Sequence, residues 1–138
     1  MDKRIKKDKE DKELTTFNVP LDLGEFKENI SFVTYIPKSS KPTKKQLINQ
    51  AINYHVEGNI SQAAKYYQYV INLGSNDPIV FSNYGLILRD QGKTKESEYL
   101  LRKAIELKPD FAQAHLNLGT LLTELGKLKE AEISYKKA

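Results

Sequence analysis

Hydrophobic positions between residues 44 and 138 recur with the period of an α-helix, and the pattern itself repeats at a step of 34 residues. Glycines mark the step most clearly, at Gly58, Gly92 and Gly126. Because glycine adopts a left-handed backbone without steric cost, this spacing predicts that each glycine ends one helix and lets the chain reverse into the next. We therefore expect six helices, over residues 44–57, 61–74, 78–91, 95–107, 111–125 and 129–138.

Small and large side chains occupy fixed columns of the same step. Two antiparallel helices approach closely only where one presents a small residue to a bulky partner, so such columns predict helix pairs packed in register through three repeats. No strand is required. The small column holds Ala51, Gly85 and Gly119, and the large column holds Tyr67, Leu101 and Tyr135. Residues suited to helix N-caps precede four of the predicted helices, at Thr43, Ser61, Asp77 and Asp110.

The second and third units, FSNYGLILRDQGKTKESEYLLRKAIELKPDF and AQAHLNLGTLLTELGKLKEAEISYKKA, closely resemble the tetratricopeptide repeat (TPR) family, and LINQAINYHVEGNISQAAKYYQYVINLG resembles it more loosely. The resemblance implies an all-α protein, a right-handed α-solenoid of about three helix-turn-helix repeats. Its concave face would be lined by the first helix of each pair and would bind a peptide or partner segment. The expected organisation is a tail over residues 1–43, then repeats at 44–77, 78–111 and 112–138, the last incomplete.

A projection of the first helices at about 100° per residue separates two stripes of side chains. One stripe faces the packing helix, and a second lies about a third of a turn or more away and is the predicted groove. Its apolar members supply contact area, and its polar members tune specificity. The predicted peptide-binding residues are Ile48, Asn49, Ile52, His55, Asn83, Leu86, Arg89, Asn117, Thr120 and Thr123.

Asparagine recurs within this stripe at Asn49, Asn83 and Asn117. A carboxamide both donates and accepts, which matches the N–H and C=O of an extended peptide backbone. The arrangement resembles the asparagine ladder in the TPR region of O-linked N-acetylglucosamine transferases. The alternative is that these asparagines are ordinary exposed helix residues or local hydrogen-bonding groups.

A second binding mode known in the family, a clamp for carboxylates of chaperone C-termini, requires lysine, asparagine and arginine on the first helices. The corresponding places here carry uncharged residues, so we predict that the chain lacks this clamp. They are Ile48, Ile52, Leu86, Leu116 and Thr120.

The composition offers little for catalysis, metals or membranes. The chain has no cysteine and two histidines, and neither histidine lies in a catalytic or metal-binding pattern, so we expect no enzyme activity, cofactor or metal. His115 falls in a packing column. The net charge is +4, but bases and acids alternate, which makes nucleic acid a weak alternative. No apolar run is long enough to span a membrane and the N-terminus is charged, so a cytoplasmic protein without membrane contact is expected.

The tail over residues 1–43 lacks helical periodicity and is expected to be mostly unstructured. Its segment 17–37 is too apolar for a spacer. We expect it to cap the first helix pair; the alternative is an internal ligand in the groove.

The last predicted helix ends with apolar positions that a solenoid normally covers. Three explanations stay open: a fragment of a longer array, the arm of an enzyme, or self-association through this uncapped repeat. The predicted function is a protein-protein interaction scaffold that binds an extended peptide in the groove. The alternative is the N-terminal substrate-recruiting arm of a larger transferase-type enzyme.

Overall fold

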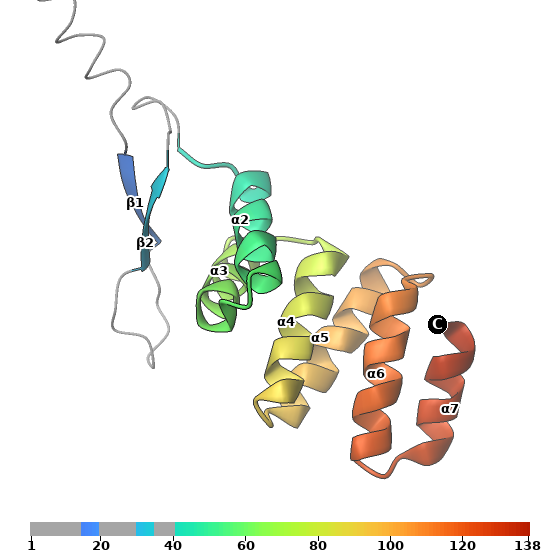
Figure 1. The fold of residues 1–138 in the computed structure, drawn as a ribbon. Helices are drawn as coiled ribbons and strands as arrows, with labels where there is room; N and C mark the ends of the chain where they lie inside the picture. The colour runs from blue at the N-terminus through green and yellow to red at the C-terminus, as the bar shows by residue number, and fades with distance from the viewer. Residues whose placement is uncertain (1–14, 20–29, 35–40) are drawn as a thin grey trace, which may run out of the picture. The chain divides into compact units, whose positions relative to one another are not determined.

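A computed structural model describes residues 15–19, 30–34 and 41–138 (Figure 1). The chain divides into two compact units, Met1–Tyr69 and Val70–Ala138. The described residues form two strands and six helices. These elements are β1 (Thr15–Val19), β2 (Ile30–Thr34), α2 (Lys44–Val56), α3 (Ile60–Asn72), α4 (Pro78–Asp90), α5 (Thr94–Leu107), α6 (Ala112–Glu124) and α7 (Leu128–Lys137).

The helices begin and end within two residues of the predicted bounds, which confirms the helical repeat. At the start of α2, the Thr43 hydroxyl accepts a hydrogen bond from the Gln46 amide (3.2 Å), and the Gln46 side chain accepts one from the Thr43 amide (2.8 Å). This reciprocal pair is a capping box. At the start of α4, the Asp77 carboxylate accepts a hydrogen bond from the Ile79 amide at 2.9 Å.

Two of the predicted N-caps are wrong. Helix α3 begins at Ile60, so Ser61 lies inside its first turn. At α6 the N-cap is Phe111, which makes no side-chain cap bond, because the turn through Asp110 closes with a bond from the Phe111 amide to the Lys108 carbonyl (3.1 Å). The helix therefore starts one residue later than an Asp110 cap requires.

The turn glycines have the predicted backbone. Gly58, Gly92 and Gly126 have φ values of 81°, 79° and 76°, in the left-handed region where a Cβ is disfavoured. Each is followed by a bond from the next residue's amide back to the helix, as in Lys93 to Leu88 at 2.8 Å. The glycines thus reverse the chain between the helices of a pair.

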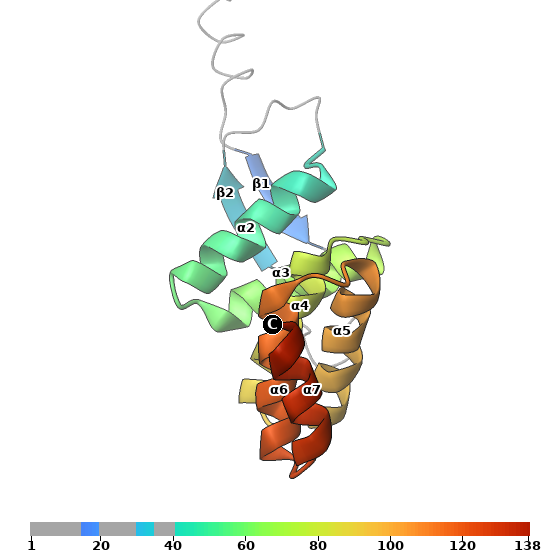
Figure 2. The same ribbon diagram turned by 90° about the vertical axis from the view of Figure 1, so that its right-hand side faces the viewer.

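In the unit Val70–Ala138, the pairs α4/α5 and α6/α7 are joined by contacts of α6 with both α4 and α5 (Figures 1 and 2). The small column allows the close approach. A Cβ built on Gly85 would lie 2.9 Å from Cγ of Leu101, and one on Gly119 would lie 2.7 Å from the ring of Tyr135. Ser97 adds a buried hydrogen bond, donating to the Gly85 carbonyl at 2.6 Å. Small therefore faces large, as the columns predict.

The strands are a feature that the helical periodicity did not predict. β1 and β2 pair antiparallel, with Thr15 opposite Thr34 and Val19 opposite Ile30. They fall within and just before the apolar segment 17–37, and the rest of the predicted tail, apart from residues 41–43, lies outside the described residues. The helical region is all-α, and this hairpin precedes it in sequence.

Candidate peptide-binding face

The predicted groove residues of the first repeat lie on α2. Asn49 is exposed, and Ile48, Ile52 and His55 are half-buried. The Nδ1 atom of His55 lies 3.2 Å from the hydroxyl of Tyr67 on α3, and the two rings meet edge to face at 5.9 Å. Tyr67 is fully buried, so it holds the His55 ring from the core side.

The predicted residues of the second and third repeats lie on α4 and α6. Asn83, Leu86 and Arg89 on α4 are half-buried. On α6, Thr120 is half-buried and Thr123 is exposed. Asn117, the third asparagine of the column, differs from these residues because it is buried.

Asn117 is buried, with 5 % of its surface exposed, and both ends of its carboxamide are bound within the protein. Its Nδ2 donates to the hydroxyl of Ser82 on α4 at 3.3 Å, and its Oδ1 accepts from the Gln113 side chain at 3.0 Å. A buried carboxamide that is already paired has little capacity for a ligand backbone. For Asn117 the geometry therefore favours the alternative of a local hydrogen-bonding group that joins two helices.

Replacement of Asn117 by alanine is expected to lower the free energy of unfolding by about 1–2 kcal/mol, because it strands the fully buried Ser82 hydroxyl. The matched control is Asn49→Ala, which removes an exposed carboxamide and is expected to change stability by less than about 0.5 kcal/mol. Urea unfolding followed by far-UV circular dichroism measures both. Equal effects of the two changes would contradict a structural role for Asn117.

A polar cluster joins the C-terminal ends of α4 and α6 to α7. The Thr123 hydroxyl lies 3.3 Å from the hydroxyl of Tyr135, and Arg89 lies 3.9 Å from a carboxylate oxygen of Glu124. The hydroxyls of Thr123 and then Thr120 hold the pKa of Tyr135 below its ordinary value of 10.0, with a further contribution from the charge of Arg89. Of the predicted site residues, Thr123 contacts Tyr135 directly, whereas the Thr120 hydroxyl donates to the Leu116 carbonyl at 3.0 Å and Arg89 pairs with Asp90 at 3.0 Å.

The column of large residues predicts a core role for Tyr135 and no part in the site, but 42 % of its surface is exposed. The signal that identifies it is the repeat itself. Tyr135 occupies the place of Tyr67, and Thr123 the place of His55, so the same pair of positions is joined through a phenol hydroxyl in the first and third repeats. The groove residue of each pair is positioned by the second helix of its own repeat.

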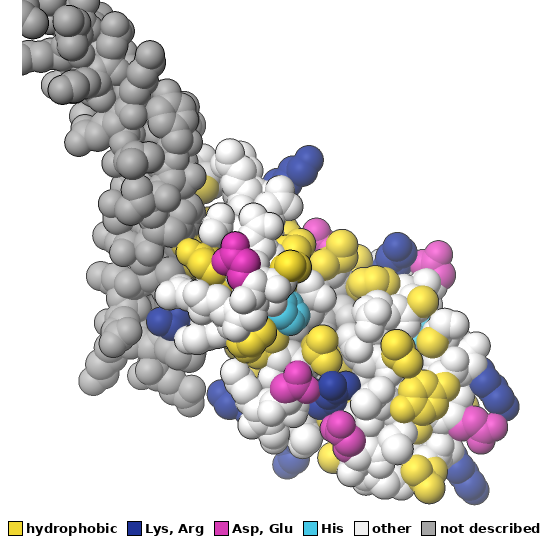
Figure 3. Space-filling view, viewed as in Figure 1, with side chains coloured by type: hydrophobic (Ala, Val, Ile, Leu, Met, Phe, Trp, Pro, Cys, Tyr) yellow, Lys and Arg dark blue, Asp and Glu magenta, His cyan; other side chains and the backbone are white. Residues whose placement is uncertain are grey.

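Apolar side chains accompany these polar groups on the first helices. Leu116 on α6 is 44 % exposed and Ile79 on α4 is 42 % exposed. Leu116, Thr120 and Thr123 follow one another at helical spacings of four and three residues, so they share one face of α6. Figure 3 shows apolar side chains scattered among charges of both signs over the helical part of the molecule. A partner of such a face needs apolar contact and hydrogen bonds more than charge.

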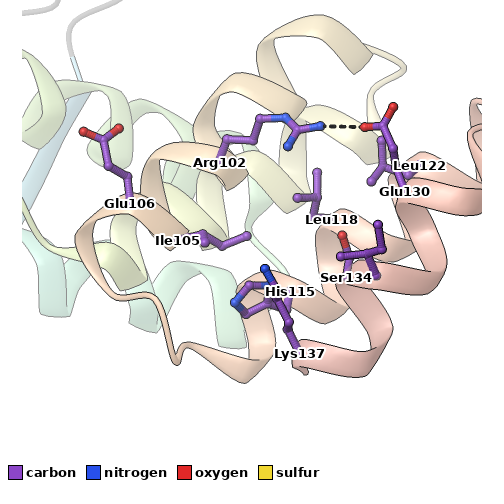
Figure 4. Close-up of a pocket in the computed structure, with 10 residues that line it drawn as sticks. Arg102, Ile105, Glu106, His115, Leu118, Leu122, Glu130, Ser134 and Lys137 are labelled. Carbon is purple, nitrogen blue, oxygen red and sulfur yellow. Dashed lines mark hydrogen bonds and ion pairs between the residues drawn. The ribbon is translucent and has the colours of Figure 1, made fainter.

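A cavity of about 470 Å³ lies elsewhere, between α5, α6 and α7 (Figure 4). None of the predicted groove residues lines it. Its apolar wall includes Ile105 and Leu118, and the ion pair between Arg102 and Glu130 (3.1 Å) crosses its edge. His115 also lines the cavity and lies 2.7 Å from the Pro109 carbonyl through Nε2, which fixes the ring in place.

Arg102 also belongs to an ion-pair network between α5 and α7. Glu98 accepts from Arg102 at 2.8 Å and lies 3.5 Å from Lys127. Burial raises the pKa of Glu98, but its hydrogen bonds and ion pairs with Arg102 and Lys127 outweigh that effect, and the net pKa is lowered.

Because the pKa of Glu98 is lowered on folding, its stabilisation is complete above the ordinary value of 4.5 and is lost as the pH falls through the folded value. The change Glu98→Gln is therefore expected to cost about 1 kcal/mol or less at pH 7 and nothing at pH 2. Urea midpoints measured between pH 2 and pH 7 give the test. Glu132→Gln, at an exposed helix pair with Lys136, is the control, and an equal pH dependence for the two variants would refute the network.

Comparisons with known proteins agree with this fold. Residues 85–126 match the family model described as a TPR repeat. No curated protein matches the sequence at a significant level. The matched residues lie within the helical region, from α4 to the turn before α7.

Solved structures share the helical arrangement at low sequence identity. The second TPR of Spaghetti (RPAP3) bound to HSP90 peptide SRMEEVD is 23 % identical, with a TM-score of 0.63 over 68 % of this chain and 87 % of that one. The first TPR of Spaghetti, bound to the same peptide, is 20 % identical, with a TM-score of 0.63 over 68 % and 75 %. MamA is 19 % identical, with a TM-score of 0.65 over 69 % and 56 %. At these identities the similarity shows the fold alone.

None of the helices in the described residues has the length and apolar character to cross a membrane. Across residues 41–138 and the two strands, no three histidine, aspartate or glutamate side chains are grouped to hold a metal ion.

Proposed function

We propose that this protein is an interaction scaffold whose first helices bind an extended segment of a partner protein. The observation that carries the proposal is the exposed Leu116, which shares one face of α6 with the hydroxyls of Thr120 and Thr123. An exposed leucine beside convergent polar groups is the combination that peptide grooves use, since the apolar contact supplies affinity and the polar groups fix the backbone.

The solved structures of similar fold support a peptide as the ligand class. Two of them are TPR regions bound to an HSP90 peptide that ends in the acidic sequence EEVD. In this chain the places that correspond to the family's carboxylate clamp hold Ile48, Ile52, Leu86 and other uncharged residues, and we predict that the clamp is lacking. We therefore propose a ligand with apolar side chains, held partly through its backbone, in place of an acidic C-terminus.

The asparagine column is revised within this proposal. Asn49 is exposed and offers its carboxamide to a ligand, whereas Asn117 is paired with Ser82 and Gln113. The proposed binding residues on the later repeats are Leu116, Thr120 and Thr123 on α6 and Arg89 on α4. Tyr135 is a further proposed contact. Any closer likeness to the O-linked N-acetylglucosamine transferases stays a prediction.

Selection of a random peptide library on the full chain, followed by site mapping, tests the proposal. The chain has no cysteine, so Thr123→Cys and Ile133→Cys each place one thiol, the first on the proposed face and the second on exposed α7 surface. A selected peptide is expected to slow maleimide labelling at position 123 and leave position 133 unchanged. Protection at position 133 alone, or the absence of any selected peptide, would overturn the proposal.

A further inference from the structure

The cavity between α5, α6 and α7 lies at a place that the preceding repeat fills with side chains. The apolar positions of its lining correspond, 34 residues earlier, to residues that are buried in one hydrophobic cluster or packed against it. Those earlier residues are Ile71, Phe81, Tyr84, Leu88 and Leu100. The cavity therefore lies within a packing arrangement that the same chain closes one repeat earlier.

Three differences between the two repeats open this space. Each puts a smaller side chain on the cavity wall, and two of them replace an apolar residue by a polar one. His115 takes the place of Phe81, Leu118 that of Tyr84, and Ser134 that of Leu100. The resulting volume of about 470 Å³ lies within the range of about 300–1,000 Å³ that is typical of small-molecule sites.

His115 brings an unused acceptor to the cavity wall. Its side chain is buried, with 3 % of the residue exposed, and its Nε2 atom lies 2.7 Å from the Pro109 carbonyl oxygen. A carbonyl oxygen can only accept, so Nε2 carries the hydrogen, and in the neutral ring Nδ1 is left as an acceptor. No described residue donates to Nδ1.

Ser134 adds a hydroxyl that no described residue binds, although only 7 % of the residue is exposed. Figure 4 shows the Ser134 side chain on α7 and the Ile105 side chain on α5 directed toward one another across the cavity. Other hydroxyls of this repeat return to the helix backbone, as Thr123 does by donating to the Gly119 carbonyl at 2.9 Å. A buried hydroxyl without such a bond is costly, and a polar ligand atom would satisfy it.

The charges around the cavity leave one cation uncompensated. Arg102 pairs with Glu130 at 3.1 Å, and Glu106 pairs with Lys103 at 3.6 Å and points away from the other side chains of the lining (Figure 4). Lys137 also lines the cavity and has no ion pair within the part of the chain that the structure describes. An ammonium group in this position favours a carboxylate as its partner.

We propose that this cavity binds a small aromatic carboxylate that carries a hydroxyl group. The ring of the ligand would supply the contacts with Ile105 and Leu118 that aromatic side chains supply in the preceding repeat. The carboxylate would pair with Lys137, and the polar atoms of Ser134 and His115 would hold the remaining oxygen atoms. None of the residues proposed to bind a peptide lines the cavity, so the inference goes beyond that function and does not depend on it.

Titration calorimetry of the full chain with 4-hydroxyphenylacetate tests the proposal. We expect saturable binding at one site, and a loss of affinity of about tenfold for Lys137→Met, because the charged hydrogen bond is removed. Lys136→Met is the matched control, since Lys136 pairs with Glu132 on the exposed surface of α7 and its loss should leave the affinity unchanged. The uncharged 4-hydroxyphenylacetamide should bind at least about tenfold more weakly than the acid.

A variant that fills the cavity separates binding there from binding elsewhere. Ser134→Leu with Leu118→Tyr introduces the residues that the preceding repeat carries, and binding of the probe should be lost while helicity is kept. If this double variant does not fold, Ser134→Leu alone decides, with the same expected loss. Ser134→Ala removes the hydroxyl without filling the space and should weaken binding without abolishing it.

Four results would overturn the proposal. They are the absence of saturable binding, binding that survives the filled cavity, equal affinities for the acid and the amide, and equal losses for Lys137→Met and Lys136→Met. Sedimentation of the same variants tests a second copy of the chain as the occupant. Self-association that the filled variant loses would place a neighbouring chain in the cavity and would also refute a small-molecule site.

Discussion

The change Leu101→Ala is expected to lower the free energy of unfolding by about 3–4 kcal/mol. Leu101 is fully buried on α5 and belongs to a core cluster with Leu118, Leu121 and Leu122 of α6. It also fills the space that Gly85 leaves open on α4, so its loss removes contacts on both sides. Alanine there leaves a cavity that two flanking helices cannot both close.

Urea unfolding monitored at the helical circular dichroism signal measures the effect. Leu128→Ala is the matched control, since 65 % of this leucine's surface is exposed and its loss should cost less than about 0.5 kcal/mol. A loss below about 1 kcal/mol for Leu101→Ala would mean that the repeats are not coupled through this column.

The double variant Gly85→Ala with Leu101→Ala refines the same prediction. Alone, Gly85→Ala places a Cβ 2.9 Å from Cγ of Leu101 and overpacks a buried contact. In the shortened background that clash disappears, and alanine gains helix propensity of about 1 kcal/mol over glycine. Gly85→Ala should therefore be favourable only in the Leu101→Ala background. Such coupling between two changes is what direct contact of the two side chains produces.

The helical repeat could be predicted from sequence because its signals are local and periodic. Gly58, Gly92 and Gly126 each need only their own backbone conformation to end a helix, and all three have it. The Gly85–Leu101 contact can be predicted for the same reason, since both residues belong to columns that recur at the same step through the repeats.

The hairpin could not be predicted in this way. Its strands are separated by residues 20–29, and their register depends on pairing across that interval and not on a repeated step. A single hairpin also has no second copy in the chain against which a pattern could be recognised.

The asparagine column shows the limit of periodicity within the helices. Asn117 is buried where α6 packs on the preceding repeat, and Ser82 of that repeat supplies its hydrogen-bond partner. Asn49 belongs to the first repeat of the described chain and is exposed. Equal spacing thus gives equal positions on a helix but not equal environments, because the environment depends on the neighbouring repeat.

The role of Tyr135 in the polar cluster does not follow from its column for a related reason. Its column is a core column in the first repeat, where Tyr67 is fully buried, but Tyr135 is 42 % exposed. The same ring that fills the gap left by Gly119 also brings its hydroxyl to Thr123. The Tyr135 side chain therefore both packs through its ring and presents a hydroxyl group. A pattern of small and large residues predicts only the packing.

Replacement of Leu116 by aspartate is expected to weaken binding of a selected peptide by about 10- to 100-fold, with stability unchanged to within about 0.5 kcal/mol. The side chain is 44 % exposed in the free protein, so its charge costs little there. In the complex the same carboxylate would be desolvated against an apolar ligand, which costs several times more. Titration calorimetry with the peptide, at matched helicity, measures the effect.

Ile133→Asp is the control, because Ile133 is 56 % exposed on α7 and lines the cavity beside α5, away from the proposed face. The affinity of the Ile133→Asp variant for the peptide should match that of the unaltered protein. The reverse result, loss of binding with Ile133→Asp and none with Leu116→Asp, would move the ligand to the cavity between α5, α6 and α7. Because both changes introduce the same charge at sites of similar exposure, a difference between them reports where the peptide lies and not a general effect of charge.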